Sequence, residues 1–288
     1  APDSPAVAAA SSALQRTLDL EQVAKCDIFT GHENDVGKTP WGRVFGGQVL
    51  AQSLVAAYRT VPEGLQVHSL HGFFLLAGES GVEILFEVDR VRDGASFATR
   101  GVKAMQRNRA IFQLSASFHR PEWGPEFQTP GRELWAIARA RGLKENKLPT
   151  PDELLARGVR PDVANSADNH KETESLAIQF GDWWSLRYVR HRAPLPGGAP
   201  RGLHESIFAW ISDSMMVTLV ARPHQTRHRH SFPMTFSLDH SIHFHRPFRV
   251  DEWLCFHTRT TVSSGARGLA RLEVFNMDGH LVATVSQE

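Results

Sequence analysis

The sequence predicts an α+β fold built from two tandem units, each an antiparallel sheet wrapped around a long central helix. Two observations predict this architecture. An apolar helical stretch followed by several strand-like segments occurs in residues 14–119 and again in residues 204–288. Short motifs also recur between the two regions at a nearly constant spacing. A spacing held through several elements indicates a duplicated structural unit.

Composition sets the broad class of the protein. The chain has 288 residues, of which 41% are hydrophobic, and this is enough for a substantial core. Its formal net charge of +1 gives no reason to expect nucleic acid or an anionic membrane as a partner. The two cysteines, Cys26 and Cys255, suit a reducing compartment, and every apolar run is shorter than the roughly 18 residues that span a bilayer. We therefore expect a globular protein without an integral membrane segment.

The first unit begins after a predicted disordered leader, residues 1–13, and a short helix near Ser12–Glu21. Gly46 and Gly47 then precede a run whose apolar spacing predicts a helix buried on most sides. Alternating segments bounded by turn residues follow, and they predict four antiparallel strands. These strands are Val67–Ala77, Val82–Arg92, Phe97–Gln106 and Arg109–Phe118.

Residues 120–203 differ in composition, with clusters of proline and glycine, and predict a long connector. A short helix is expected near Glu133–Arg141 and a strand near Trp183–His191. The second unit then starts with an apolar helical stretch over Glu205–Ala221.

Numbering makes the repeat explicit. His68-Ser69-Leu70-His71 corresponds to His240-Ser241-Ile242-His243 at a spacing of 240 − 68 = 172. The turn Arg107-Asn108 corresponds to Asp278-Gly279 at 278 − 107 = 171. One helix and an antiparallel meander, repeated, describe a double hotdog fold.

Several motifs resemble those of the type II acyl-CoA thioesterases of bacteria and their peroxisomal relatives. They are Val44-Phe45-Gly46-Gly47-Gln48, His68-Ser69-Leu70-His71, Arg92-Asp93-Gly94-Ala95-Ser96-Phe97, Asp239-His240-Ser241 with Phe244-His245-Arg246-Pro247-Phe248, and Ser263-Ser264-Gly265-Ala266-Arg267-Gly268. The resemblance spans both units in order. It implies hydrolysis of acyl-CoA to fatty acid and CoA by an activated water, with no cofactor.

The resemblance also implies three catalytic residues, Asp213, Ser237 and Gln287. Asp213 lies in an apolar helical run, where a carboxylate is costly unless it has polar partners. In this mechanism Asp213 takes a proton from water, Ser237 orients the water, and Gln287 holds the water or the carboxylate. The alternatives are that Ser212 or Asp213 caps a helix N-terminus, that Ser237 only lines the core, and that Gln287 is a frayed terminal residue.

Other constellations are weaker. Asp239, His240 and Ser241 cannot form a local triad, because alternation places Asp239 and Ser241 on one strand face and His240 on the other. The histidines between His224 and His245 lack the carboxylate or thiolate spacing of a metal site, so no metal is expected. Gln287 aligns with Ala116 in the first unit (287 − 116 = 171), which predicts one catalytic centre and not two.

Candidate substrate-binding residues are Arg246 and Arg267, which could meet the anionic CoA moiety, with a structural role as the alternative. His68 is a further candidate, with core or interface packing as its alternative. Leu76 and Ala77 stand where relatives usually carry Arg and Pro, which puts a CoA contact there in doubt.

We thus expect an acyl-CoA thioesterase, active as a homodimer or homotetramer. The absence of a Ser-Lys-Leu-type tail favours a cytoplasmic location. The alternatives are a hotdog acyl-CoA hydratase or dehydratase, which would need an Asp/His pair near the helix start, and a non-catalytic acyl-CoA-binding module.

Overall fold

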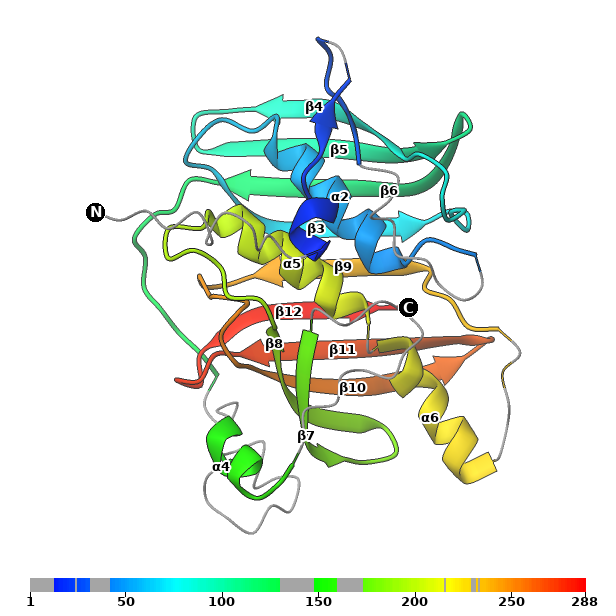
Figure 1. Cartoon of the computed structure of the whole chain (residues 1–288), viewed down its shortest axis with the longest axis vertical. Helices are drawn as coiled ribbons and strands as arrows, with labels where there is room; N and C mark the ends of the chain where they lie inside the picture. Colours follow the sequence, from blue (N-terminus) through cyan, green and yellow to red (C-terminus); the bar gives the residue numbers. More distant parts are fainter. Residues whose placement is uncertain are drawn as a thin grey trace.

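The computed structural model describes residues 13–23, 25–31, 42–129, 148–159, 173–214, 216–228, 232 and 234–288. Its strands form one antiparallel sheet in the order β1-β2-β4-β5-β6-β3-β9-β12-β11-β10-β8-β7 (Figure 1). The first six are β1 Glu21–Gln22, β2 Ile28–Thr30, β4 Leu85–Asp93, β5 Phe97–Gln106, β6 Arg109–His119 and β3 Gln66–Phe74. The second six are β9 Asp239–Phe244, β12 Leu281–Gln287, β11 Arg267–Phe275, β10 Leu254–Ser264, β8 Trp184–His191 and β7 Thr173–Phe180. The predicted α+β class is confirmed.

The strand order is the same in both halves when each is read outward from the centre. The halves join where β3 pairs with β9, with Leu70 opposite Ile242. At the outer edges, β7 and β8 stand beside β10 as β1 and β2 stand beside β4. The strand predicted near Trp183–His191 is confirmed as β8, but it lies in the segment expected to be a connector. We therefore propose that the second unit begins at β7 and not at residue 204.

Two long helices pack on one face of this sheet. They are α2 (Gly46–Tyr58) and α5 (Arg201–Asp213), and the described chain also contains α1 (Ala13–Thr17), α4 (Pro151–Ala156) and α6 (Met216–His228). Helices α2 and α5 lie side by side and antiparallel (Figure 1), because Tyr58 at the end of α2 contacts Glu205 near the start of α5. Apolar side chains on both helices, such as Leu50, Leu54 and Phe208, are fully buried in the core. Burial of each stabilises the fold by about 2 kcal/mol.

The prediction of one continuous helix over Glu205–Ala221 is wrong. Helix α5 ends at Asp213 and α6 begins at Met216. The Ser214 hydroxyl donates a hydrogen bond to the Ile211 carbonyl oxygen at 2.7 Å, and the Ser214 N–H bonds the same oxygen at 3.2 Å. Such side-chain bonds to the backbone compete with the helical ladder. The break matters because it places Asp213 at a helix C-terminus, so Asp213 does not cap a helix N-terminus.

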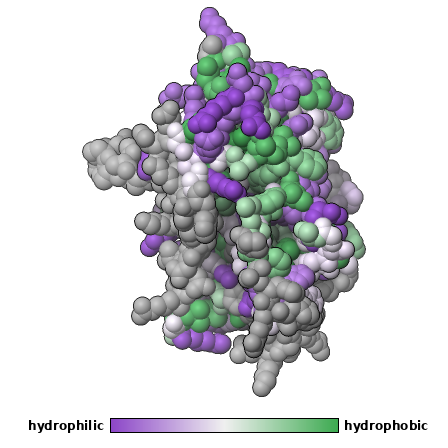
Figure 2. Space-filling view, turned by 90° about the vertical axis from the view of Figure 1, so that its right-hand side faces the viewer, coloured by the Kyte–Doolittle hydropathy of each residue, from purple (hydrophilic) through white to green (hydrophobic). Residues whose placement is uncertain are grey.

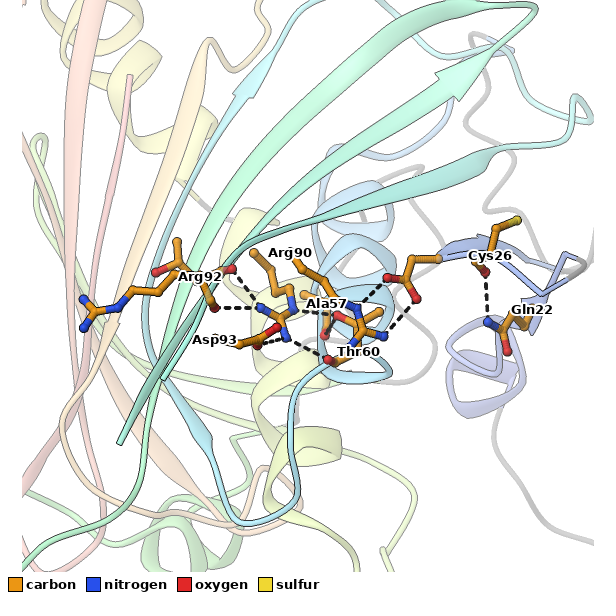
Figure 3. Close-up of polar contacts among 10 residues, drawn as sticks. Gln22, Cys26, Ala57, Thr60, Arg90, Arg92 and Asp93 are labelled. Carbon is orange, nitrogen blue, oxygen red and sulfur yellow. Dashed lines mark hydrogen bonds and ion pairs between the residues drawn. The ribbon is translucent and has the colours of Figure 1, made fainter. Parts of the chain in front are cut away.

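A buried arginine fixes the other end of α2. Arg100 on β5 is fully buried and donates to the Thr60 carbonyl oxygen and hydroxyl, both at 2.8 Å, and to the Asp93 carboxylate at 2.5 Å. Figure 3 shows this cluster of Thr60, Arg92 and Asp93 around the end of the helix. Thr60 also donates to the Ala57 carbonyl oxygen at 2.9 Å. The guanidinium thus holds Thr60, whose hydroxyl supplies a donor to one of the last carbonyls of α2.

Two predicted elements fall outside the described residues: nearly all of the leader 1–13, and the helix near Glu133–Arg141. The short helix expected near Ser12–Glu21 is present as α1 over Ala13–Thr17. Within the described ranges, none of the helices has the length and apolar character needed to span a membrane.

Candidate active site

Asp213 is the last residue of α5 and points toward the other helix. It is only 8% exposed. The carbonyl end of a helix is its negative end, so this position gives a carboxylate no support from its own helix. Asp213 therefore depends on donors that come from other elements.

Gln287, on β12, supplies one of these donors. Its amide N–H donates to Asp213 Oδ1 at 2.7 Å and to the Ser237 hydroxyl oxygen. Ser237 lies just before β9, whereas Gln287 ends β12, the strand that pairs with β9. Gln287 is 2% exposed, so it is not a frayed terminal residue. The structure thus brings together the three residues that the sequence nominated, although they are far apart along the chain.

His240 lies behind the carboxylate. It is fully buried on β9, its Nε2 is 3.0 Å from the Ser212 hydroxyl, and its Nδ1 is 3.8 Å from Asp213 Oδ1. Burial lowers the pKa of His240 to about 4, against a smaller opposing effect of the Gln287 amide. The imidazole is therefore neutral near pH 7. Strand alternation predicted that His240 lies on the opposite strand face from Asp239 and Ser241, but the sequence did not link it to Asp213.

The N-terminus of α2 meets the same carboxylate. A Cβ atom on Gly46 would lie 2.9 Å from Asp213 Oδ2, and one on Gly47 would lie 2.6 Å from the Trp210 carbonyl oxygen. Only glycine permits this close approach of two backbones. Because the first N–H groups of a helix lack acceptors within it, the positive end of α2 faces the Asp213 side chain.

An apolar groove of about 460 Å³ leads away from Gln287. It lies between α6, the start of β11 and the segment before β9, and its walls include Val217, Val220, Leu238 and Ala270. Its size is within the range of sites for small organic ligands. Figure 2 views the side of the molecule on which α2 begins and α5 ends, and shows hydrophobic surface at mid-height. Exposed apolar residues before β9, Met234 and Phe236, line this groove.

The three candidate substrate residues occupy different places. Arg267 lines the groove, and its Nε donates to Glu288 Oε1 at 3.0 Å. Arg246 lies beyond the opposite end of β9 from Ser237 and pairs with Glu126 at 3.3 Å. His68 is on β3, where its Nε2 is 2.8 Å from the Ser117 hydroxyl. Of the three, only Arg267 lines the groove that reaches Gln287.

The remaining polar residues of β9 face away from Asp213. Asp239 accepts from the Glu288 N–H at 2.9 Å and contacts His71 Nε2 at 2.8 Å. Its side chain and that of His240 therefore lie on opposite faces, as alternation predicts. Among the residues that the structure describes, no group of three or more His, Cys, Asp or Glu side chains is arranged to hold a metal ion.

Both halves of the chain are similar to known acyl-CoA thioesterases. Residues 172–288 match a family model described as acyl-CoA thioesterase, and residues 37–119 match one described as acyl-CoA thioesterase N-terminal domain. Acyl-coenzyme A thioesterase 8 of Homo sapiens is 32% identical over 297 residues, covering 94% of this chain and 86% of that protein.

Solved structures with the same fold are similar to this chain over nearly its whole length. An acyl-CoA thioesterase II from Mycobacterium marinum is 31% identical with a TM-score of 0.74, covering 96% of this chain and 95% of that chain. A hot dog fold protein from Alicyclobacillus acidocaldarius is 20% identical with a TM-score of 0.71, covering 96% of this chain and 97% of that one. The second likeness concerns the fold alone, and together they identify the two-unit sheet as a double hotdog.

Proposed function

The chain belongs to the type II acyl-CoA thioesterase family and is a thioester hydrolase, and on that premise we propose that Asp213, Ser237 and Gln287 hold the water that attacks the substrate. The observation that carries this proposal is the Gln287 amide, which bonds both the buried Asp213 carboxylate and the Ser237 hydroxyl. One amide thus fixes two groups that can each contact the same water molecule.

In this mechanism Asp213 is the general base. It takes one proton as the water oxygen bonds to the thioester carbonyl carbon, and the carbon–sulfur bond breaks when the tetrahedral intermediate collapses. The CoA thiolate leaves, and Asp213 releases its proton to the thiolate or to solvent, which restores the base. A free thiol has a pKa of about 8.5, so the leaving group needs little help from an acid. Ser237 and Gln287 keep the water oriented, which lowers the entropy cost of the attack.

The N-terminus of α2 is the candidate for binding the developing oxyanion. Gly46 lies against Asp213 Oδ2, so a carbonyl attacked by water at Asp213 would be close to the first N–H groups of α2. Backbone donors fixed in advance at this position would stabilise the negative charge more in the transition state than in the substrate. The close approach that Gly46 and Gly47 permit is therefore part of the proposed chemistry.

The apolar groove next to Gln287 suits the acyl chain. Each methylene that enters it contributes about 0.8 kcal/mol of binding free energy. Arg267, at the groove, is the remaining candidate for the anionic CoA moiety. A homodimer or homotetramer and a cytoplasmic location stay predictions.

The Asp213–His240 pair is the one observation that favours a hydratase, since such an enzyme needs an acid–imidazole pair near a helix start. The sequence alone does not indicate this pair. However, His240 is fully buried and its Nε2 is occupied by Ser212, so the imidazole supports the carboxylate and does not reach a substrate. We expect crotonyl-CoA to lose its thiol without being hydrated.

Turnover of palmitoyl-CoA, followed with a thiol reagent, tests the proposed function. We expect Asp213→Asn to lower kcat by about 10²- to 10⁴-fold, the usual contribution of a general base. The matched control is Asp239→Asn, on the face of β9 opposite His240 and its cross-strand partner Gln287, which should keep its activity. Equal turnover of Asp213→Asn and the parent protein would remove Asp213 from the mechanism.

A further inference from the structure

A second cavity, of about 630 Å³, lies at the opposite end of the α2–α5 pair. Helices α2 and α5 have the same length of 13 residues and run antiparallel. The start of α2 and the end of α5 therefore form the proposed active site, whereas the start of α5 and the end of α2 border the second cavity. The internal repeat thus relates the end of the helix pair that carries the proposed active site to the end that borders the second cavity. Figure 1 shows the two helices side by side.

The second cavity has no catalytic carboxylate at the related position. Tyr58 ends α2 as Asp213 ends α5. The Tyr58 hydroxyl donates to Glu205, accepts from the Val67 N–H at 2.9 Å, and its ring packs on Phe118 at 5.0 Å between centroids. Phe118 and the aligned Ala116 both lack the amide that Gln287 provides. A thioester bound here would meet no counterpart of the Asp213–Gln287 pair.

Two buried polar atoms, on residues that line the second cavity, have no hydrogen-bond partner in the described structure. Ser206 is fully buried on α5 and lines the cavity, and its hydroxyl makes no hydrogen bond. The Oε1 atom of Gln66, on β3, is also buried without a hydrogen-bond partner, and Gln66 also lines the cavity. Leaving such groups buried and unpaired destabilises the protein. A ligand that offers both an acceptor and a donor would recover this free energy.

The rest of the cavity suits an apolar ligand. Three of the charged residues that line it form ion pairs, Arg59 with Asp19 at 3.2 Å and Arg201 with Glu205 at 2.6 Å. The walls are mainly apolar and include Leu18, Val55, Val61, Leu65 and Leu203. Helix α5 begins after Pro200 without a side-chain cap, so its first N–H groups add donors at this end.

We propose that the second cavity binds a fatty acyl chain by its carbonyl end and holds it without hydrolysis. The Ser206 hydroxyl and the start of α5 would donate to the carbonyl oxygen, and Gln66 Oε1 would accept from an N–H group such as those of the pantetheine arm. A CoA thioester supplies that donor, and a free fatty acid supplies the same acyl carbonyl. The assignment rests on the proposed active site. The second cavity lies at the end of the helix pair that the repeat relates to that site, and this relation identifies the ligand class.

Binding stoichiometry tests this proposal with the full chain. The probe is S-(2-oxoheptadecyl)-CoA, a ketone analogue of palmitoyl-CoA that keeps the carbonyl and cannot be hydrolysed, titrated below its micelle concentration by calorimetry. We expect two equivalents per chain for the parent protein. Val61→Trp, which fills the second cavity, should bind one equivalent and keep full turnover of palmitoyl-CoA, whereas Val61→Ala, the matched control, should bind two.

Ser206→Ala leaves the shape of the cavity nearly unchanged, so it tests the proposal even if the tryptophan variant misfolds. It should weaken only one of the two equivalents, by roughly 2- to 12-fold, the range for one hydrogen bond. One equivalent for the parent protein, or two for Val61→Trp, would overturn the proposal while leaving the active site untouched.

Val217→Trp, in the groove beside Gln287, separates the two claims. This variant should lose the ketone analogue bound in the groove, which is one of the two equivalents, and should also lose turnover of palmitoyl-CoA. If Val217→Trp kept full turnover, the proposed acyl groove would fail, whatever the stoichiometry of the second cavity. Competition with palmitate distinguishes the sources of the ligand: loss of one equivalent identifies the free acid, and retention of both identifies the CoA thioester.

Discussion

Replacing Gln287 with alanine removes the amide that joins Asp213 to Ser237. The bond to Asp213 Oδ1 is 2.7 Å long and reaches a carboxylate, and a hydrogen bond to a charged group contributes about 1.5–3 kcal/mol. At about 1.4 kcal/mol per tenfold change in rate, this bond alone corresponds to a loss of roughly 10- to 150-fold in kcat. The second bond, to Ser237, adds to it, so we expect a loss of about 10²-fold or more.

The assay is steady-state release of CoA from palmitoyl-CoA, with KM and kcat measured separately. KM should change little, because Gln287 positions water and contacts only the end of the acyl groove. The matched control is Ser286→Ala, the neighbouring residue on the other face of β12, which should behave like the parent protein. A thermal unfolding curve must accompany the rates, since the buried Asp213 loses a partner. Unchanged kcat in a folded Gln287→Ala variant would refute the water-holding arrangement.

Two further predictions concern Ser237 and Glu205. Ser237→Ala removes the hydroxyl that orients the water and should lower kcat by about 10²-fold, while Ser237→Thr, which keeps the hydroxyl, should recover most of the rate in the same assay. Burial raises the pKa of Glu205 from 4.5 to about 7, so the folded protein binds more protons than the unfolded chain between these values. Its contribution to stability is complete below pH 4.5 and is lost as the pH rises through about 7, a change on the order of 3 kcal/mol. In chemical denaturation, the Glu205→Gln variant should lack this decrease in the free energy of unfolding. His240 has a lowered pKa, so it makes the free energy of unfolding rise between about pH 4 and 6.5. This effect is the same in the parent protein and the variant. A parallel pH dependence of the two proteins would contradict the prediction for Glu205.

The repeat made most of the fold predictable. Helical spacing around Leu50 and Leu54 and strand alternation around His240 are local signals, and both describe the structure correctly. The break after Asp213 was missed because its signature is local: the Ser214 hydroxyl and N–H both bond the Ile211 carbonyl oxygen of the same helix. In a mostly apolar run such a bond leaves no periodic signal.

The candidate site was predictable in part, through the resemblance and not through spacing. Asp213, Ser237 and Gln287 come from three elements, and only the pairing of β9 with β12 beside the end of α5 brings them together. The contact of Gly46 with Asp213 depends on the antiparallel packing of α2 on α5, which joins residues more than half the chain apart. Such long-range packing has no trace in local sequence, and the same is true of the cavity around Ser206.

The central claim is that water, and not a protein carboxylate, attacks the thioester. A single turnover in oxygen-18 water, with enzyme in excess over palmitoyl-CoA and mass analysis of both product and protein, tests it most directly. Direct attack by water predicts that the fatty acid from this first turnover carries one oxygen-18 atom and that Asp213 carries none. Unlabelled fatty acid together with label in Asp213 would show an acyl-enzyme intermediate and contradict the account.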